Sequence, residues 1–238
     1  MNTNNSALYL RHRFPAEIIS RCVWLYYFRF CLSFRDIEEM MRERGIIVSY
    51  ETIRWWCLKF VEAYAKRIRS RSSRPGDRWH LDEVFLKIKG EVQYLWRAVD
   101  QDGEVLDILV QPHRNKRATK KFFRKLLKGL KYAPRVIVTD KLGSYSAAKQ
   151  DVLPSVDHQR EKYHNNRAEN SHQPTRERER RMRGFKSAGH AQRFLSAFST
   201  VASFFRPGRH LFRAANYREI MRRRFAQWFE IAEIQPAN

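Results

Sequence analysis

The stretch from Trp79 to Pro112 constrains the fold most, because its apolar and polar residues alternate with a period of two. Its strand-like runs are rich in Val, Leu and Ile and are separated by turns that contain Gly90 and Gly103. Strands joined by turns this short can pair only as an antiparallel meander. The pattern therefore predicts three consecutive antiparallel strands, at 79–90, 91–100 and 104–112.

A helix and a further strand are expected next. Residues 116–130 place Phe122, Leu126 and Leu130 on one face and lysines on the other, which predicts an amphipathic helix. Residues 135–140 form a short apolar run, typical of a strand buried on both faces. Meander, crossover helix and buried strand follow in this order in the ribonuclease-H-like fold. We therefore expect an α/β domain with a mixed five-stranded sheet and flanking helices.

Two carboxylates lie on strands that this fold would make neighbours. Asp82 lies inside the first strand, and Asp140 ends the fourth. Neighbouring strands are ~4.8 Å apart, and two ionised carboxylates at that range repel by about 3–4 kcal/mol at an effective dielectric constant near 20. Such a pair persists if it is protonated or binds a cation, and carboxylate oxygens suit Mg²⁺ or Mn²⁺. Taken alone, Asp140 is equally an ordinary residue at the end of a strand.

A third carboxylate, Glu169, lies near the start of a predicted helix otherwise dominated by arginine. Pro174 should interrupt that helix. Glu177 and Glu179 are the alternative third acids, but both lie beyond Pro174 and alternate with arginines, as residues in surface ion pairs do.

Other acidic residues of the sheet have simpler explanations. Glu83 alternates to the opposite face of its strand from Asp82, so we do not expect it to bind the cation. Asp100 and Asp102 flank a glycine turn and are interpreted as turn residues.

The N-terminal third predicts helices over 15–30, 34–44 and 50–69. Ser33 and Asp36 form a capping-box pattern, Gly45 ends the second helix, and Ser49 caps the third. Basic residues early in the third helix favour a DNA-binding helix-turn-helix, and a plain three-helix bundle is the alternative. In that third helix a buried stripe is expected to contain Ile53, Cys57, Phe60 and Tyr64.

Positive charge is spread along the chain, whose net charge is +22. Residues 1–78, 79–163 and 164–238 carry +7, +6 and +9. Distributed charge indicates a surface that faces a polyanion, with nucleic acid first and an anionic membrane second. The most apolar stretch, 18–32, contains two arginines and is too short to span a bilayer. With no signal-peptide pattern and three cysteines outside any CxxC pair, we expect a soluble cytoplasmic protein without zinc or disulfides.

Composition also suggests where domains meet. Residues 66–77 are rich in Arg, Ser, Pro and Gly, as linkers are. The expected organisation is a helix-turn-helix domain at 1–65, a basic linker at 66–78, a catalytic domain at 79–210 and a helical extension at 211–238. Helices expected at about 190–205 and 217–230 carry apolar stripes typical of packing or dimer surfaces.

Four motifs follow one another along the chain: Trp79-His-Leu-Asp-Glu83, Tyr94-Leu-Trp-Arg-Ala-Val-Asp100, Val138-Thr-Asp-Lys141 and Asn165-Asn-Arg-Ala-Glu-Asn-Ser-His172. Together they resemble the transposases of insertion-sequence family six, which are small bacterial and archaeal DDE transposases. The resemblance covers nearly the whole chain and implies a catalytic core like that of retroviral integrases. It assigns Asp82, Asp140 and Glu169 as the catalytic, metal-binding triad. The 28 residues between Asp140 and Glu169 form a shorter interval than in several members, and we place the deletion in a predicted loop at 148–158.

This resemblance implies DNA cleavage and joining at element ends, without a covalent enzyme intermediate, on two Mg²⁺ or Mn²⁺ ions. The implied partners are double-stranded DNA of the ends and target and further copies of the chain, in a homodimer or larger synaptic complex. Neither a membrane nor a small-molecule substrate is expected, and the location would be the nucleoid of a prokaryote. The alternatives are a related ribonuclease-H-like nuclease or integrase and a non-catalytic helix-turn-helix regulator.

DNA contacts are predicted in two regions. In the helix-turn-helix they are Tyr50, Arg54 and Lys59. Near the triad, Lys141 is a phosphate clamp, and His172 is either a phosphate contact or a structural hydrogen-bond donor. The predicted grip on the DNA backbone consists of Arg176, Arg178, Arg180, Arg181, Arg183 and Lys186.

Overall fold

The computed structural model describes residues 6–28, 30–71, 75–160, 165–207 and 212–234. The chain divides into two compact units, one formed by 73–196 and the other by 1–72 together with 197–238.

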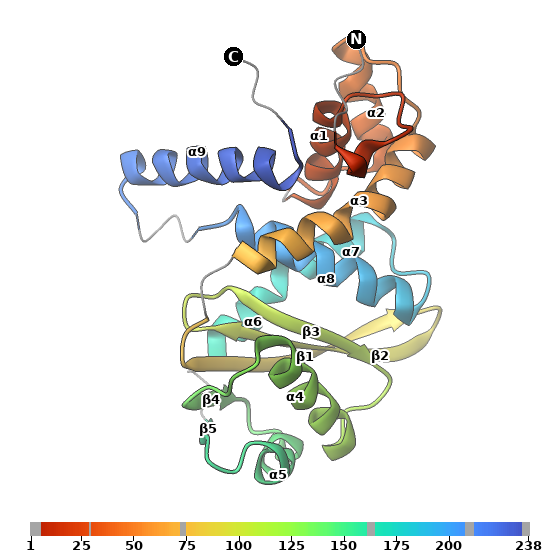
Figure 1. The fold of residues 1–238 in the computed structure, drawn as a ribbon. Coiled ribbons are helices and arrows are strands. Elements are labelled where there is room, and N and C mark those ends of the chain that lie inside the picture. The colour runs from red at the N-terminus through yellow and green to blue at the C-terminus, as the bar shows by residue number, and fades with distance from the viewer. Residues whose placement is uncertain (1–5, 29, 72–74, 161–164, 208–211, 235–238) are drawn as a thin grey trace. The chain divides into compact units, whose positions relative to one another are not determined.

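Unit 73–196 is built on one five-stranded sheet of order β3-β2-β1-β4-β5 (Figure 1). β1, β2 and β3 form an antiparallel meander, and β4 and β5 extend the sheet in parallel with β1. The predicted meander and mixed sheet are therefore confirmed, and this strand order is that of the expected ribonuclease-H-like fold. The strands are β1 (Arg78–Ile88), β2 (Glu91–Asp100), β3 (Val105–Gln111), β4 (Val136–Thr139) and β5 (Asp157–Arg160).

Two helices cover one face of this sheet, namely α4 (Lys116–Leu130) and α5 (Gly143–Val152). Because strand residues alternate between faces, every second residue of β1 and β2 faces these helices. The result is an apolar core that includes Leu81, Trp96 and Phe122, all fully buried.

The other face carries α6 (Asn166–Ser171), which packs on β1 and β2, and is followed by α7 (Gln173–Arg181). The two helices meet at His172, so the predicted interruption by Pro174 is confirmed. The first part of α8 (Ala188–Phe204) also belongs to this unit. There Gln192 binds the outer edge of β3, accepting from Val110 N at 2.8 Å and donating to the Ile108 carbonyl at 3.3 Å, which satisfies main-chain groups that an edge strand leaves unpaired.

The predicted loop at 148–158 is wrong. α5 runs to Val152 and β5 begins at Asp157, so only residues 153–156 connect regular elements. A shortened interval before Glu169 therefore cannot be assigned to one long loop in this region.

The other unit is helical. It contains α1 (Ala16–Tyr27), α2 (Phe34–Glu43), α3 (Tyr50–Arg71), the end of α8 and α9 (Ala214–Ile231), with a short 3₁₀ turn at Ala7–Tyr9. The capping box of Ser33 and Asp36 is present, and Gly45 has φ +72° as its position after a helix requires. The predicted stripe of α3 is buried, where Tyr64 hydrogen-bonds Tyr9 at 2.7 Å.

α3 continues to Arg71, so the start of the predicted linker is helical, and residues 72–74 lie outside the described residues. The division into four segments stays a prediction. Cys22, Cys31 and Cys57 are free thiols. Within the described ranges, none of the helices combines the length and apolar character that crossing a bilayer requires.

Candidate active site

Asp82 and Asp140 lie on neighbouring parallel strands. Leu81 of β1 pairs with Thr139 of β4, so the residues that follow them reach the same level of the sheet. The predicted pairing of these strands is confirmed. Burial and, to a smaller extent, the nearby charge of Asp140 raise the pKa of Asp82 to about 6.

Asp140 is the more accessible of the two carboxylates. Its Oδ1 accepts a hydrogen bond from Leu142 N at 3.0 Å, which fixes the turn that leads into α5. Its Oδ2 lies 3.7 Å from a guanidinium nitrogen of Arg114, and about a third of the side chain is exposed. One oxygen of Asp140 is therefore held by the fold, while the other faces the guanidinium group of Arg114.

Arg114 also binds Glu83 on the α4 side of the sheet. Its Nε donates to Glu83 Oε1 at 2.6 Å, and Tyr145 donates its hydroxyl to Oε2 at 2.6 Å. Burial raises the pKa of Glu83 to about 7. Because both Glu83 oxygens have protein partners, its geometry agrees with the expectation that it is not a metal ligand. Arg114 was not predicted, since nothing local marks a residue just before a helix as a neighbour of Asp140.

Two buried polar side chains hold α6 and the start of α7 against the sheet. Arg97, opposite Asp82 in the β1–β2 ladder, donates to the Ser171 carbonyl and to Thr175 Oγ1. Asn165 donates through Nδ2 to the Leu81 carbonyl at 2.9 Å.

His172 is buried beside them, 2% exposed, with its Nε2 3.4 Å from Asp82 Oδ2. Burial holds the pKa of His172 well below its usual range, so the ring is a neutral neighbour of Asp82. This interior position favours the structural role over direct phosphate contact. Sequence reasoning missed Arg97 and Asn165, although both lie within the motifs and Arg97 stands out as a charge in the middle of a sheet strand.

Glu169 lies in the first turn of α6 and is exposed. Among the described residues, no three His, Cys, Asp or Glu side chains are close enough to hold one metal ion. The structure thus brings Asp82 and Asp140 together and positions the helix that carries Glu169, without placing Glu169 in a cluster with them. His164, at the start of the quoted segment, lies outside the described residues.

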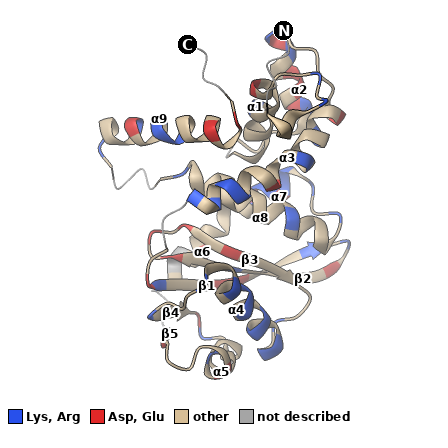
Figure 2. Ribbon diagram, in the orientation of Figure 1, with Lys and Arg blue, Asp and Glu red and all other residues tan. Residues whose placement is uncertain are grey.

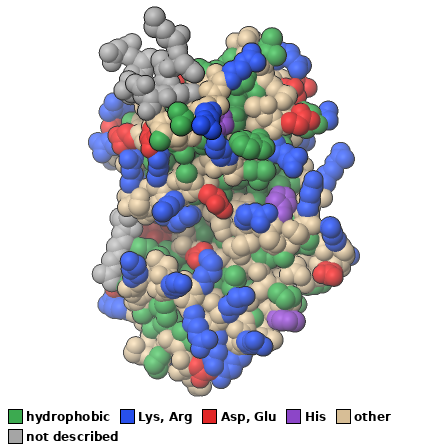
Figure 3. Space-filling view, turned by 45° about the vertical axis from the view of Figure 1, so that its right-hand side comes forward, with side chains coloured by type: hydrophobic (Ala, Val, Ile, Leu, Met, Phe, Trp, Pro, Cys, Tyr) green, Lys and Arg blue, Asp and Glu red, His purple; other side chains and the backbone are tan. Residues whose placement is uncertain are grey.

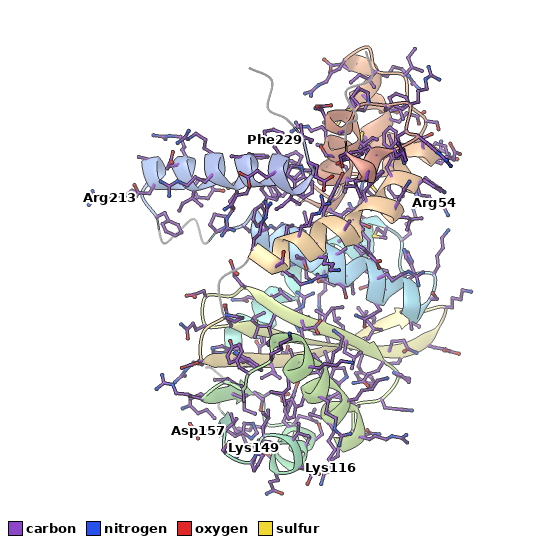
Figure 4. All side chains as sticks on the ribbon, in the orientation of Figure 1. Arg54, Lys116, Lys149, Asp157, Arg213 and Phe229 are labelled. Atoms are coloured by element: carbon purple, nitrogen blue, oxygen red, sulfur yellow. The ribbon has the colours of Figure 1, made fainter. Side chains whose placement is uncertain are left out.

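The predicted DNA-binding residues of α3 lie on its surface. Arg54 is exposed and points outward from the helix (Figure 4). Lys59 is also exposed, and its Nζ lies 2.8 Å from His12 Nε2. Tyr50 is half-buried, with the guanidinium of Arg35 4.6 Å from its ring centre.

Most of the predicted arginine grip is exposed, but Arg178 is not. It is fully buried in α7, where its guanidinium lies 5.5 Å from the ring centre of Phe194. Every fourth residue of a helix returns to the same face, and this position faces α8. Arg178 is therefore withdrawn from the DNA contacts. The exposed members of the grip are Arg176, Arg180, Arg181, Arg183 and Lys186, and the predicted phosphate clamp Lys141 is also exposed.

The chain is similar to transposases of known insertion sequences. A family model described as a DDE domain matches residues 76–207, more than half of the chain. The transposase for insertion sequence-like element IS431mec of Staphylococcus aureus is 31% identical over 186 residues, which cover 76% of this chain and 82% of that protein. The transposase for insertion sequence element IS257 in transposon Tn4003, also from Staphylococcus aureus, is 30% identical with the same coverage.

A slighter likeness extends to a solved structure, the HTLV-2 integrase catalytic core domain in complex with magnesium (dimeric form). It covers 40% of this chain and 67% of that chain, at 20% identity and a TM-score of 0.34. The family match and the two Staphylococcus relatives identify this chain as a member of the DDE transposases of insertion-sequence family six.

Proposed function

We propose that this transposase binds the terminal inverted repeats of its element and catalyses metal-dependent cleavage and strand transfer of DNA. The observation that carries the proposal is the pair of Asp82 and Asp140 at one level of adjacent parallel strands. Support also comes from the buried contacts of Arg97 and Asn165, which hold the helix of Glu169 over those strands.

The residues present fit a site for divalent cations. Burial and, second, the charge of Asp140 raise the pKa of Asp82 to about 6, and a bound cation would offset both effects by neutralising the carboxylates. Asp82, Asp140 and Glu169 would hold the Mg²⁺ or Mn²⁺ ions. When bound, such ions supply Lewis acidity at the phosphate and lower the pKa of the attacking hydroxyl or water.

The protein's own side chains then position this site and its substrate. His172 lies 3.4 Å from Asp82 Oδ2 and Arg97 lies opposite Asp82 in the β1–β2 ladder, so both border the carboxylate on its buried side. Arg114 lies beside the exposed oxygen of Asp140, where its remaining N–H groups can donate to a phosphate oxygen.

Two sets of exposed cations would bind DNA outside the site where the reaction takes place. Arg54 and Lys59 of α3, with Tyr50, are proposed to bind the terminal repeat. Lys141 and the exposed cations of α7 and the segment after it, Arg176, Arg180, Arg181, Arg183 and Lys186, would grip phosphates without reading sequence. Cutting and joining two ends calls for a homodimer or a larger synaptic complex.

Asp82→Asn tests the assignment, because it removes a metal-binding charge at nearly constant size. Strand transfer of an element-end oligonucleotide in Mg²⁺ should fall below detection, while binding to the same oligonucleotide stays within twofold of the wild type. Asp102→Asn is the matched control, since Asp102 is an exposed turn residue of the same sheet, and it should transfer strands normally. Strand transfer by Asp82→Asn at the wild-type rate would falsify the triad. A wild-type protein that binds the oligonucleotide but transfers no strands would instead leave a DNA-binding regulator as the better hypothesis.

A further inference from the structure

Helix α4 presents a stripe of four exposed cations, Arg117, Lys121, Arg124 and Lys128. Their spacings of four, three and four residues place them along one side of the helix. The opposite side packs on the sheet through Phe122 and Leu126, so the stripe faces outward. Figure 2 shows this repetition of Lys and Arg along α4.

The stripe differs from the other lysines of the same helix. Lys116 and Lys120 both form ion pairs with Asp151, the first at 2.9 Å, and Lys125 forms one with Asp107. Figure 4 shows Lys116 on the side of α4 that lies next to α5. None of the four stripe residues forms an ion pair with a described residue. Their charge is therefore available to an outside partner, whereas that of the flanking lysines is already matched.

The stripe starts at the candidate active site. Arg114 lies three residues before Arg117, and its guanidinium reaches Asp140 at 3.7 Å. From Arg117 to Lys128 the helix rises 1.5 Å per residue, so the stripe runs for about 16 Å away from that point. A strand held at the two aspartates could thus continue along α4.

This surface is separate from the predicted arginine grip. α4 covers the face of the sheet that carries Leu81 and Trp96, whereas Arg97 ties α7 to the opposite face, the one that carries Asp82. Figure 3 shows Lys and Arg side chains spread widely over the surface it presents, with few acidic ones among them. Cations on both faces of the catalytic unit suit a protein that handles more than one DNA segment.

We propose that Arg117, Lys121, Arg124 and Lys128 form a second DNA-binding surface, which holds the sugar–phosphate backbone of duplex DNA that leaves the active site. The inference rests on the proposed function for its substrate. Duplex DNA carries one negative charge per ~1.7 Å of axis and has a major groove ~12 Å wide, so a stripe of about 16 Å spans several phosphates. The four side chains would donate to phosphate oxygens, and such contacts position duplex DNA without carrying sequence information.

The test compares two triple variants of α4 that change net charge equally. Arg117→Gln/Lys121→Gln/Arg124→Gln removes unpaired cations, and Lys116→Gln/Lys120→Gln/Lys125→Gln removes paired ones. Binding to a duplex oligonucleotide of unrelated sequence is measured by fluorescence anisotropy across a NaCl series, without divalent cations. The first variant should lower the magnitude of the slope of log K against log salt by about 2.7, at about 0.9 for each lost contact. The second should lower the magnitude of this slope by less than about 0.9, the value for one contact.

Equal slopes for the two variants would reduce the stripe to a contribution to net charge and overturn the proposal. An unchanged slope in the first variant would overturn it too, leaving a solvated helix face or a surface for an acidic protein. If circular dichroism shows that either triple variant does not fold, the single variants Lys121→Gln and Lys120→Gln are compared in the same way. Their slopes of log K against log salt should then differ by about 0.9, the value for one contact. Because this assay needs no metal and no chemistry, its result is independent of strand transfer by Asp82→Asn.

Discussion

The two faces of the catalytic sheet are held by different kinds of contact. Under α4 and α5 the core is built from fully buried apolar side chains such as Trp96 and Phe122, with the hydrogen bond of Tyr145 to Glu83 among them. Under α6 and α7 the contacts are directional, since Arg97 and Asn165 are buried polar groups that donate hydrogen bonds to named atoms on the facing element.

This difference suggests that the stability of the unit and the position of Glu169 depend on opposite faces of the sheet. Apolar burial stabilises in proportion to area and tolerates small shifts, because it has no preferred direction. A buried hydrogen bond adds little net free energy but fixes two atoms to within a few tenths of an ångström. The α4 side should therefore determine whether the unit folds. The α6 side should determine whether Glu169 lies close enough to Asp82 and Asp140 to act with them.

The largest effect is expected on the α4 side. Phe122→Ala should lower the free energy of unfolding by about 3–5 kcal/mol, the usual cost of emptying a core aromatic site. Urea titration measures this loss, and strand transfer per folded molecule should stay near the wild-type value. Phe85→Ala is the control, since Phe85 is 67% exposed on β1, and it should cost under about 0.5 kcal/mol. A Phe122→Ala protein that keeps its stability but loses strand transfer would reverse the comparison.

A smaller effect, of opposite sign, is expected at Asp82. Its pKa is raised from 3.8 to about 6 in the folded protein, so the folded state binds the proton more tightly than the unfolded state. This contribution to stability is complete below about pH 4 and is lost as the pH rises through 6. Asp82→Asn should therefore be more stable than the wild type by up to about 3 kcal/mol at pH 7.5 in EDTA.

Urea midpoints at pH 4.5 and pH 7.5 measure this difference. It should shrink toward zero at the lower pH, and adding Mg²⁺ at pH 7.5 should raise the midpoint of the wild type alone. An Asp82→Asn protein less stable than the wild type at pH 7.5 would show that the carboxylate stabilises the metal-free fold, against the arrangement described above.

The fold was predictable from sequence where the signal is local. Residues 91–100 and 116–130 were bounded correctly, because hydrophobic periodicity is carried by the segments themselves. α5 and β5 were missed because their own residues carry no such periodic signal. β5 is four polar residues, Asp157–Arg160, at the edge of the sheet, and forms a strand only because β4 offers it main-chain partners.

Only the part of the site that follows from strand order could be predicted from sequence. Once the meander and the buried strand were identified, Asp82 and Asp140 had to be neighbours. The contacts that hold α6 were not predictable, because Asn165 binds a carbonyl 84 residues away along the chain. Arg178 was assigned wrongly because a run of arginines gives no sign of which member faces α8.

The smallest effect on stability separates the two faces most sharply. Asn165 and Gln111 are both buried, and each donates a side-chain amide N–H to a main-chain carbonyl, Leu81 at 2.9 Å and Ala118 at 3.0 Å. Asn165→Ala and Gln111→Ala should therefore each lower the free energy of unfolding by about 1–2 kcal/mol. Asn165 lies on the α6 side of the sheet and Gln111 on the α4 side. Strand transfer in Mg²⁺ should therefore fall at least about tenfold for Asn165→Ala, because a group that supports metal ligands is lost. It should fall less than about twofold for Gln111→Ala. Equal losses of strand transfer at matched stability would mean that α6 is positioned by packing, and that the polar anchors do no more than the apolar face.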